Sequence, residues 1–246
     1  MRQPETSSLA PPPVRKDAAA EAELLSEEFH ALLRQLGPPD GFWASLIADS
    51  PLNTTHSADS LPAFLEAYQT QVLVPLEMPA ITRARAHAAR GHLRELIALD
   101  HELETKPVWP AFASASRRIG RAQLERLRPL RDERTVRRYL AAVQAGQAAG
   151  WHTVVHGLTL AVYSLPLRHG LLAYARETLA GLALAAAGPR AFAAPACQEK
   201  LQSLLRQIPA AIQQTLASCA EATIQPLSVG CLSAVGPAKA EDSVEP

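Results

Sequence analysis

The sequence has little of what marks a secreted, metal-binding or nucleic-acid-binding protein. It holds 3 cysteines among 246 residues. Cys197, Cys219 and Cys231 lie far apart without CxxC spacing, which argues against a disulfide framework and a cysteine zinc site. The 24 basic and 24 acidic side chains give a formal net charge of +0. We therefore expect no overall electrostatic attraction to nucleic acid or to an anionic membrane.

Export and membrane segments are also missing. The first residues, MRQPETSSLAPPPVRKD, contain no apolar core after the basic residue, which argues against a secretory signal. The stretch between Arg138 and Arg168 carries no charged side chain, but His152, His156 and Pro166 interrupt it. No unbroken block of about 20 apolar residues occurs, which a membrane-spanning helix requires. We expect a cytoplasmic protein with no membrane contact.

The sequence motifs of common enzymes are absent as well. No GxSxG, GxxxxGK[ST] or GxGxxG occurs. His152 and His156 stand four residues apart, so a helix would place both rings on one side, as in a metal-binding pair. The glutamate of a HExxH helix is missing, and no third ligand is evident nearby. We expect the pair to pack or cap, with no enzyme activity, cofactor or metal; a metal-dependent enzyme centred on the pair is a further alternative.

Apolar residues that recur at three- and four-residue steps run through the chain, and they predict helices. The stretch from Gly150 to Gly188 predicts two apolar helices joined by a corner at Ser164–Pro166, because Pro166 disfavours a helical conformation at the residue before it. No strand with convincing alternation is found. The expected fold is an all-α, single-domain bundle of about eight to ten helices around this central apolar hairpin.

Composition divides the chain into three parts. Residues 1–20 combine Ser, Pro and charge with few large apolar side chains, which predicts a disordered arm. Residues 21–224 form the expected helical domain, and 225–246 a flexible tail. Pro75 and Pro79 should kink or restart the helix that begins near residue 61. Other helices are expected at about 19–36, at 78–104 with a break at Gly91, and at 112–127, 132–149 and 197–222.

The helix expected at 112–127 carries two small residues one turn apart, Ser116 and Gly120. Glycine inside a helix costs roughly 1 kcal/mol relative to alanine, so its expected use is to let another backbone approach closely. Residues 117–138 contain nine arginines and three carboxylates. Such a run fits a solvated face, a surface for an acidic protein, or, as the alternative function, a helical nucleic-acid-binding regulator.

Four stretches resemble the urease accessory protein UreF family in order and spacing. The first is an early loop with Pro38, Gly41, Phe42 and Ser45, where Asp49 retains the carboxylate of the family's Gly-Leu-Glu. The other three are SLPAFLEAYQTQVLVPLEMP, then IALDHELETK followed by ASASRRIGRAQLERL, and WHTVVHGLTLAVYSLPLRHGLLAY. Together they span roughly residues 32–205.

The resemblance implies a mostly helical, non-catalytic homodimer that takes part in urease maturation. It would bind a UreD-like protein, also called UreH, together with a UreG-like GTPase and apo-urease, and it would scaffold nickel insertion. No nucleic-acid partner is implied. We expect the partner-binding residues to be Phe42, Ser45, Asp49, Arg117, Arg118, Arg121 and Tyr174, and close helix contacts at Ser116, Gly120 and Gly157.

Overall fold

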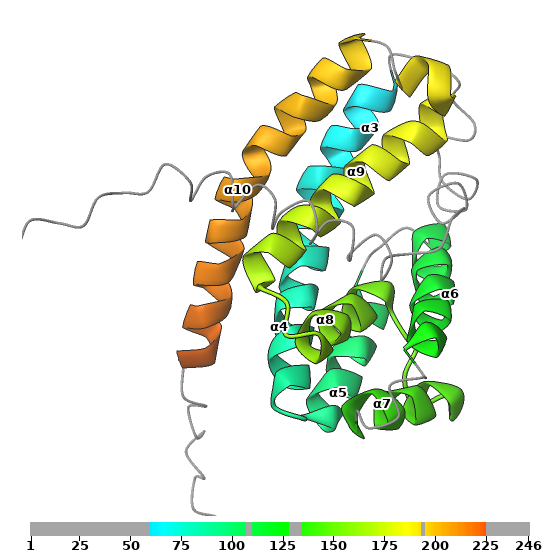
Figure 1. Ribbon diagram of the computed structural model, residues 1–246, viewed down its shortest axis with the longest axis vertical. Helices are drawn as coiled ribbons and strands as arrows, with labels where there is room; N and C mark the ends of the chain where they lie inside the picture. Colours follow the sequence, from blue (N-terminus) through cyan, green and yellow to red (C-terminus); the bar gives the residue numbers. More distant parts are fainter. Residues whose placement is uncertain (1–59, 107–109, 128–133, 193–194, 225–246) are drawn as a thin grey trace, which may run out of the picture.

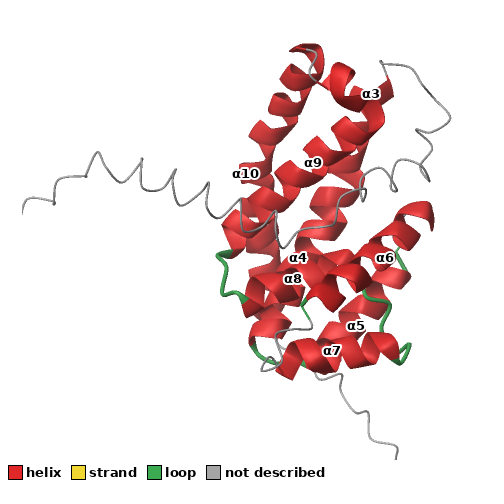
Figure 2. Cartoon of the chain, turned by 45° about the vertical axis from the view of Figure 1, so that its right-hand side comes forward, coloured by secondary structure: helices red, strands yellow, loops and turns green. Residues whose placement is uncertain are grey.

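The computed structural model describes residues 60–106, 110–127, 134–192 and 195–224. Within these ranges every regular element is a helix and no strand occurs, which confirms the all-α prediction (Figures 1 and 2). The elements are α3 (Ser60–Tyr68), η2 (Gln69–Glu77), α4 (Met78–Ala89), α5 (Leu93–Glu104), α6 (Pro110–Arg126), α7 (Arg134–Gln144), α8 (His152–Val162), α9 (Leu167–Phe192) and α10 (Pro195–Ile224). None of the helices described is long and apolar enough to cross a membrane.

Residues 60–89 run as a continuous helical stretch whose middle part, η2, is a π-helix. Pro75 lies inside η2. Proline cannot donate to the helical ladder and its ring crowds the preceding turn, and π-helical turns are rare and interrupt the regular α-helical pattern. Pro79 stands in the first turn of α4, where its missing N–H is tolerated. The two prolines therefore modify this stretch without ending it.

Two apolar clusters form the core. One is built chiefly by α3, η2, α9 and α10, and the other by α4, α5, α7 and α8, while α6 contributes to both. Figure 1 shows α3 and α9 in the upper half of the molecule, α5, α7 and α8 in the lower half, and α10 running along the side of both. Helix α4 joins the halves, because Ile81 belongs to the first cluster and Ala84 to the second.

Helix α8 is the central element of the lower half. Every residue from His152 to Leu160 is buried, as expected of a helix without a polar face. It packs against α4 and α6. At Gly157 a Cβ would lie 2.6 Å from the Ala84 Cβ and 2.7 Å from the Ile81 carbonyl oxygen. The absence of a side chain there lets α8 approach α4 closely.

The packing around α8 differs from the expected hairpin. The chain turns between α8 and α9 at Ser164, which has a φ of 53°, and Pro166 follows. Beyond this corner, however, α9 packs chiefly on α10 and α3, whereas α8 packs on α4 and α6. Gly170 and Tyr174 of α9 contact Leu160 and the histidines of α8, but most of the packing of each helix is with other elements.

The helix expected at 132–149 is shorter, because α7 ends at Gln144. Gly146 and Gly150 adopt φ values of 71° and 79°, a left-handed conformation that glycine tolerates best and that ends helices. Residues 145–151 form a loop that leads into α8. The expected arm 1–20, the helix expected near 19–36, the early loop with Phe42, Ser45 and Asp49, and the tail 225–246 lie outside the described residues.

Candidate functional site at the start of helix α8

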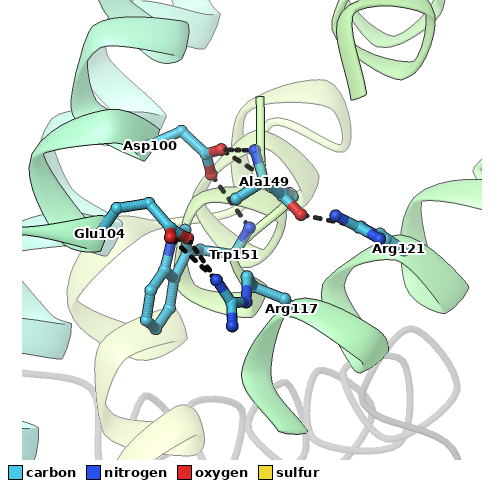
Figure 3. Close-up of polar contacts among 7 residues, drawn as sticks. Asp100, Glu104, Arg117, Arg121, Ala149 and Trp151 are labelled. Atoms are coloured by element: carbon cyan, nitrogen blue, oxygen red, sulfur yellow. Dashed lines mark hydrogen bonds and ion pairs between the residues drawn. The ribbon is translucent and has the colours of Figure 1, made fainter. Parts of the chain in front are cut away.

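The carboxylate of Asp100, on α5, is the centre of the polar network at the start of α8 (Figure 3). It is 0% exposed. It accepts hydrogen bonds of 3.0 Å from the backbone N–H groups of Gly150 and Trp151, and a further one from the N–H of Ala149. The Tyr139 hydroxyl, on α7, donates a fourth over 2.9 Å. Burial of a carboxylate is costly unless it is hydrogen-bonded, and these four donors meet that requirement.

Asp100 also places a negative charge beside the backbone N–H groups at the start of α8. Trp151 precedes α8 with an extended backbone and makes no side-chain cap of its own. The first N–H groups of a helix lack partners within the helix, and negative charge is favourable beside them. Asp100 supplies that charge from another helix. It therefore fixes both the loop and the direction in which α8 begins.

Glu104 lies one helical turn after Asp100 and forms the outer part of the network (Figure 3). It accepts hydrogen bonds from Arg117 at 3.0 and 2.8 Å, one to each carboxylate oxygen, and from the Trp151 indole N–H at 2.9 Å. The guanidinium carbon of Arg117 lies 5.9 Å from the centre of the Trp151 ring. Because the ion pair is about one-third exposed, we expect it to orient Trp151 and to add less than about 1 kcal/mol of stability.

Helix α6 contacts the loop directly through its small residues. At Gly120 a Cβ would lie 2.0 Å from the carbonyl oxygen of Gly150 and 2.7 Å from the backbone nitrogen of His152. One residue further, Arg121 donates from Nε to the Ala149 carbonyl over 2.9 Å. Ser116, one turn earlier, is buried. The α6 backbone therefore lies on the loop that Asp100 holds from the other side.

A second buried polar group joins the end of η2 to Tyr174 of α9. Glu77 is the last residue of the π-helix and is buried. The Tyr68 hydroxyl donates a 2.8 Å hydrogen bond to it. Burial raises the pKa of Glu77 from 4.5 to about 7, and the hydroxyl groups of Tyr68 and Tyr174 offset part of that increase. Near neutral pH this carboxyl is therefore close to the midpoint of its titration.

The two histidines of α8 pack against the ring of Tyr174. The Tyr174 ring centre is 5.6 Å from that of His152 and 4.9 Å from that of His156. Burial lowers the pKa of His152 to about 3, with a smaller contribution from His156, and lowers that of His156 to about 4. Both are neutral at pH 7. The described residues contain no group of three or more side chains suited to hold a metal ion, and the ring contacts favour a packing role.

A small cavity of about 20 Å³ connects the two polar groups. This is room for about one water molecule. Glu77, Ser116, Trp151 and Thr153 form part of its wall, but the surface that faces the cavity is almost entirely apolar. The remaining lining is apolar: Val72, Leu76, Leu103 and Phe112. A cavity of this size is too small for an organic substrate or cofactor.

The structure brings some of the expected site residues together and separates others. Arg117 and Arg121 are joined through the loop before α8, whereas Arg118 points to the exposed side of α6. Tyr174 is 5% exposed. Its ring is enclosed by other side chains in the structure described, and the expected contact with a partner stays a prediction. Phe42, Ser45 and Asp49 lie outside the described residues.

Sequence reasoning missed the acidic members of the site. Asp100 interrupts the buried face that Leu96, Leu99 and Leu103 otherwise make apolar. A carboxylate on such a face is rare unless it has partners. The position of Asp100 in the sequence therefore already indicated a buried, hydrogen-bonded carboxylate. Burial of Glu77 was harder to predict from the sequence. Glu77 follows Pro75 in an irregular stretch, where helical spacing does not indicate which residues are buried. The donors to both carboxylates come from distant segments, so the sequence does not show how they are paired.

Fold and site together define an all-helical protein whose polar network serves to join helices and to shape a surface. A family model for UreF matches residues 55–188. The match covers more than half of the 246 residues, and the chain belongs to the UreF family. This is a family of accessory proteins with a role in urease maturation and not a family of catalysts. No curated protein matches the chain.

Proposed function

We propose that this protein is a non-catalytic urease maturation factor. In this role it scaffolds a UreD-like protein and a UreG-like GTPase on apo-urease while nickel, the cargo, is inserted. The observation that carries the proposal is the UreF family match to residues 55–188. That range includes the network around Asp100, which holds helices α5, α6, α7 and α8 in one arrangement. A scaffold needs such fixed surfaces, because preorganisation lowers the entropic cost of binding.

We place the partner contacts on two surfaces. One is the early loop with Phe42, Ser45 and Asp49. The other is the outer side of α6, where Arg118 is exposed and where the bonds of Arg117 and Arg121 fix the loop before α8. We further propose a cytoplasmic homodimer. Light scattering of the purified protein should then give about twice the 26.4 kDa of one chain.

The proposal is tested in the organism that encodes the chain. Deletion of the gene should abolish nickel-dependent urease activity, and the wild-type gene should restore it. The tagged full-length protein should retain the UreD-like protein during purification. Unchanged urease activity in the deletion strain, with neither accessory protein retained, would contradict the proposal.

The nucleic-acid alternative has lost part of its structural basis. It depends on the arginines of residues 117–138 acting together. Arg117 is bound to Glu104, and Arg121 is bound to the Ala149 carbonyl. These two guanidinium groups are therefore bonded within the fold and are less available to bind phosphate groups. We do not carry this function forward as a second proposal.

A further inference from the structure

The turn between α4 and α5 lies against the first turn of α7. Gly91, with a φ of 68°, has its Cβ position 4.0 Å from the Thr135 hydroxyl oxygen. The five-residue segments around these positions are RGHLR, at 90–94, and RTVRR, at 134–138, so they hold five arginines and no carboxylate. In Figure 1 both segments lie at the lower end of the molecule, away from the upper ends of α9 and α10. Segments more than 40 positions apart in sequence therefore form one basic surface.

The arginines of this surface face solvent. Helix α7 buries Val136, Tyr139 and Val143, which leaves the opposite side of the helix to charged residues. We call this surface the arginine face. It consists of five exposed residues, none of which forms an ion pair or hydrogen bond with another described residue: Arg90, Arg94, Arg134, Arg137 and Arg138. Arg117 and Arg121, in contrast, form hydrogen bonds within the fold.

The position of Arg134 does not stabilise α7. Arg134 stands in the first turn of α7, which contains no acidic residue. A positive charge is unfavourable at that end of a helix, and neighbouring positive charges repel one another. The pKa of the neighbouring His87 is lowered, first by burial and then by Arg83; Glu95 offsets part of this decrease, and His92 and Arg90 add to it.

The carboxylates nearest in sequence to the arginine face are Glu95, Asp132 and Glu133. Glu95 follows Arg94 and is exposed. Asp132 and Glu133 precede α7 and lie outside the described residues. No aromatic side chain occurs in either five-residue segment, so a platform on which nucleic-acid bases could stack is missing from them. Unpaired guanidinium groups bind carboxylates through paired hydrogen bonds, and this chemistry favours an acidic protein surface.

We propose that the arginine face docks an acidic surface of a partner protein in the maturation complex, an inference that rests on the proposed function. Its main contribution is to the rate of association. Opposite charge steers partners toward each other before contact, and this steering weakens as salt increases. Arg117 and Arg121 of α6 are bonded within the fold. The exposed Arg118 and the arginines of α7 and of the α4–α5 turn are available to partners.

The test uses the full-length chain with the purified UreD-like and UreG-like proteins of the same organism. Association and dissociation rates are measured at several salt concentrations. The test variant is Arg90→Glu, Arg134→Glu and Arg138→Glu combined. The matched control, with an equal change in charge on exposed positions of α9 and α10, is Arg168→Glu, Arg176→Glu and Arg206→Glu combined. A lysine version of the test variant keeps the charge, and thermal unfolding verifies that each protein is folded.

The association rate of the test variant should fall by about tenfold or more with one of the two partners, and its salt dependence should flatten. The control variant and the lysine version should keep most of the wild-type rate. If the wild-type protein binds a partner and the test variant binds it at the same rate, the inference is wrong and the proposed function stands. If the wild-type protein binds neither partner, both are wrong. A duplex DNA of 20 base pairs is the last probe. If the wild-type protein binds this DNA more tightly than either partner protein, and the test variant loses that binding, the arginine face binds nucleic acid and the inference is wrong.

Discussion

Gly120 of α6 lies so close to Gly150 that a Cβ would fall 2.0 Å from the carbonyl oxygen of Gly150. Backbone atoms of the following two residues, Trp151 and His152, are within 2.8 Å of the same position. No flexible side-chain end is available to move away. The contact between α6 and the loop before α8 therefore depends on glycine at this position.

Gly120→Ala should destabilise the protein. Alanine favours a helix by up to about 1 kcal/mol, but the clash with backbone requires α6 or the loop to shift, at a cost of roughly 2–4 kcal/mol. The free energy of unfolding, measured in urea, should fall by about 1–3 kcal/mol. Ser114→Ala, at an exposed position of the same helix, is the control and should change it by less than about 0.5 kcal/mol. A Gly120→Ala protein as stable as wild type would show that the two backbones are further apart.

Replacement of Asp100 should release the loop before α8. Asp100→Ala leaves three backbone N–H groups and the Tyr139 hydroxyl without their acceptor, which should cost about 3 kcal/mol or more. Hydrogen exchange should accelerate at the amides of Gly150 and Trp151. Tyr139→Phe removes one donor and should cost about 1 kcal/mol. Equal effects of the two substitutions would contradict the central role assigned to the carboxylate.

Glu77 should make the stability depend on pH. Its pKa is about 7 in the folded protein against 4.5 for the free group, so the folded state binds the proton more tightly. The free energy of unfolding should therefore fall as pH rises from about 4.5 to 7, by about 3 kcal/mol in total. Glu77→Gln imitates the protonated acid. It should match wild type near pH 4.5 and exceed it at pH 8.

The comparison of wild type with Glu77→Gln isolates this carboxyl. His152 and His156 have lowered pKa values, so they act in the opposite sense and destabilise the fold as pH falls below 6.5. Both proteins contain the histidines, and the difference between their unfolding free energies removes that contribution. A difference that stays constant from pH 4.5 to 8 would show that Glu77 is ionised throughout this range.

The ion pair of Arg117 and Glu104 should contribute little to stability. Each side chain is about one-third exposed, and pairs in contact with solvent are weak. A double-mutant cycle with Arg117→Gln and Glu104→Gln should give a coupling energy below about 1 kcal/mol. Loss of the pair should instead change the Trp151 environment, visible in near-ultraviolet circular dichroism. A coupling energy of several kcal/mol would mean that the pair supports the core.

The helices were predictable because their information is local. The three- and four-residue spacing of apolar side chains predicted α5, α6 and α10 with ends within a few residues of those observed. The helix predicted at 132–149 was too long, since apolar spacing does not reveal that Gly146 and Gly150 adopt a left-handed backbone. The same pattern assumes regular α-helical turns, so it did not predict that Pro75 lies inside a π-helix.

By itself the sequence determined that the chain is helical, and its ordered blocks indicated the UreF family, because periodicity and motif order are properties of neighbouring residues. The tertiary structure decided how the polar groups are used. It assigned Asp100 to backbone donors 49 to 51 positions away, enclosed Tyr174, bound Arg117 and Arg121 within the fold, and left the arginines of α7 beside the α4–α5 turn. Charge and hydrogen bonding act through space, so a side chain's role depends on which distant segment the fold brings to it.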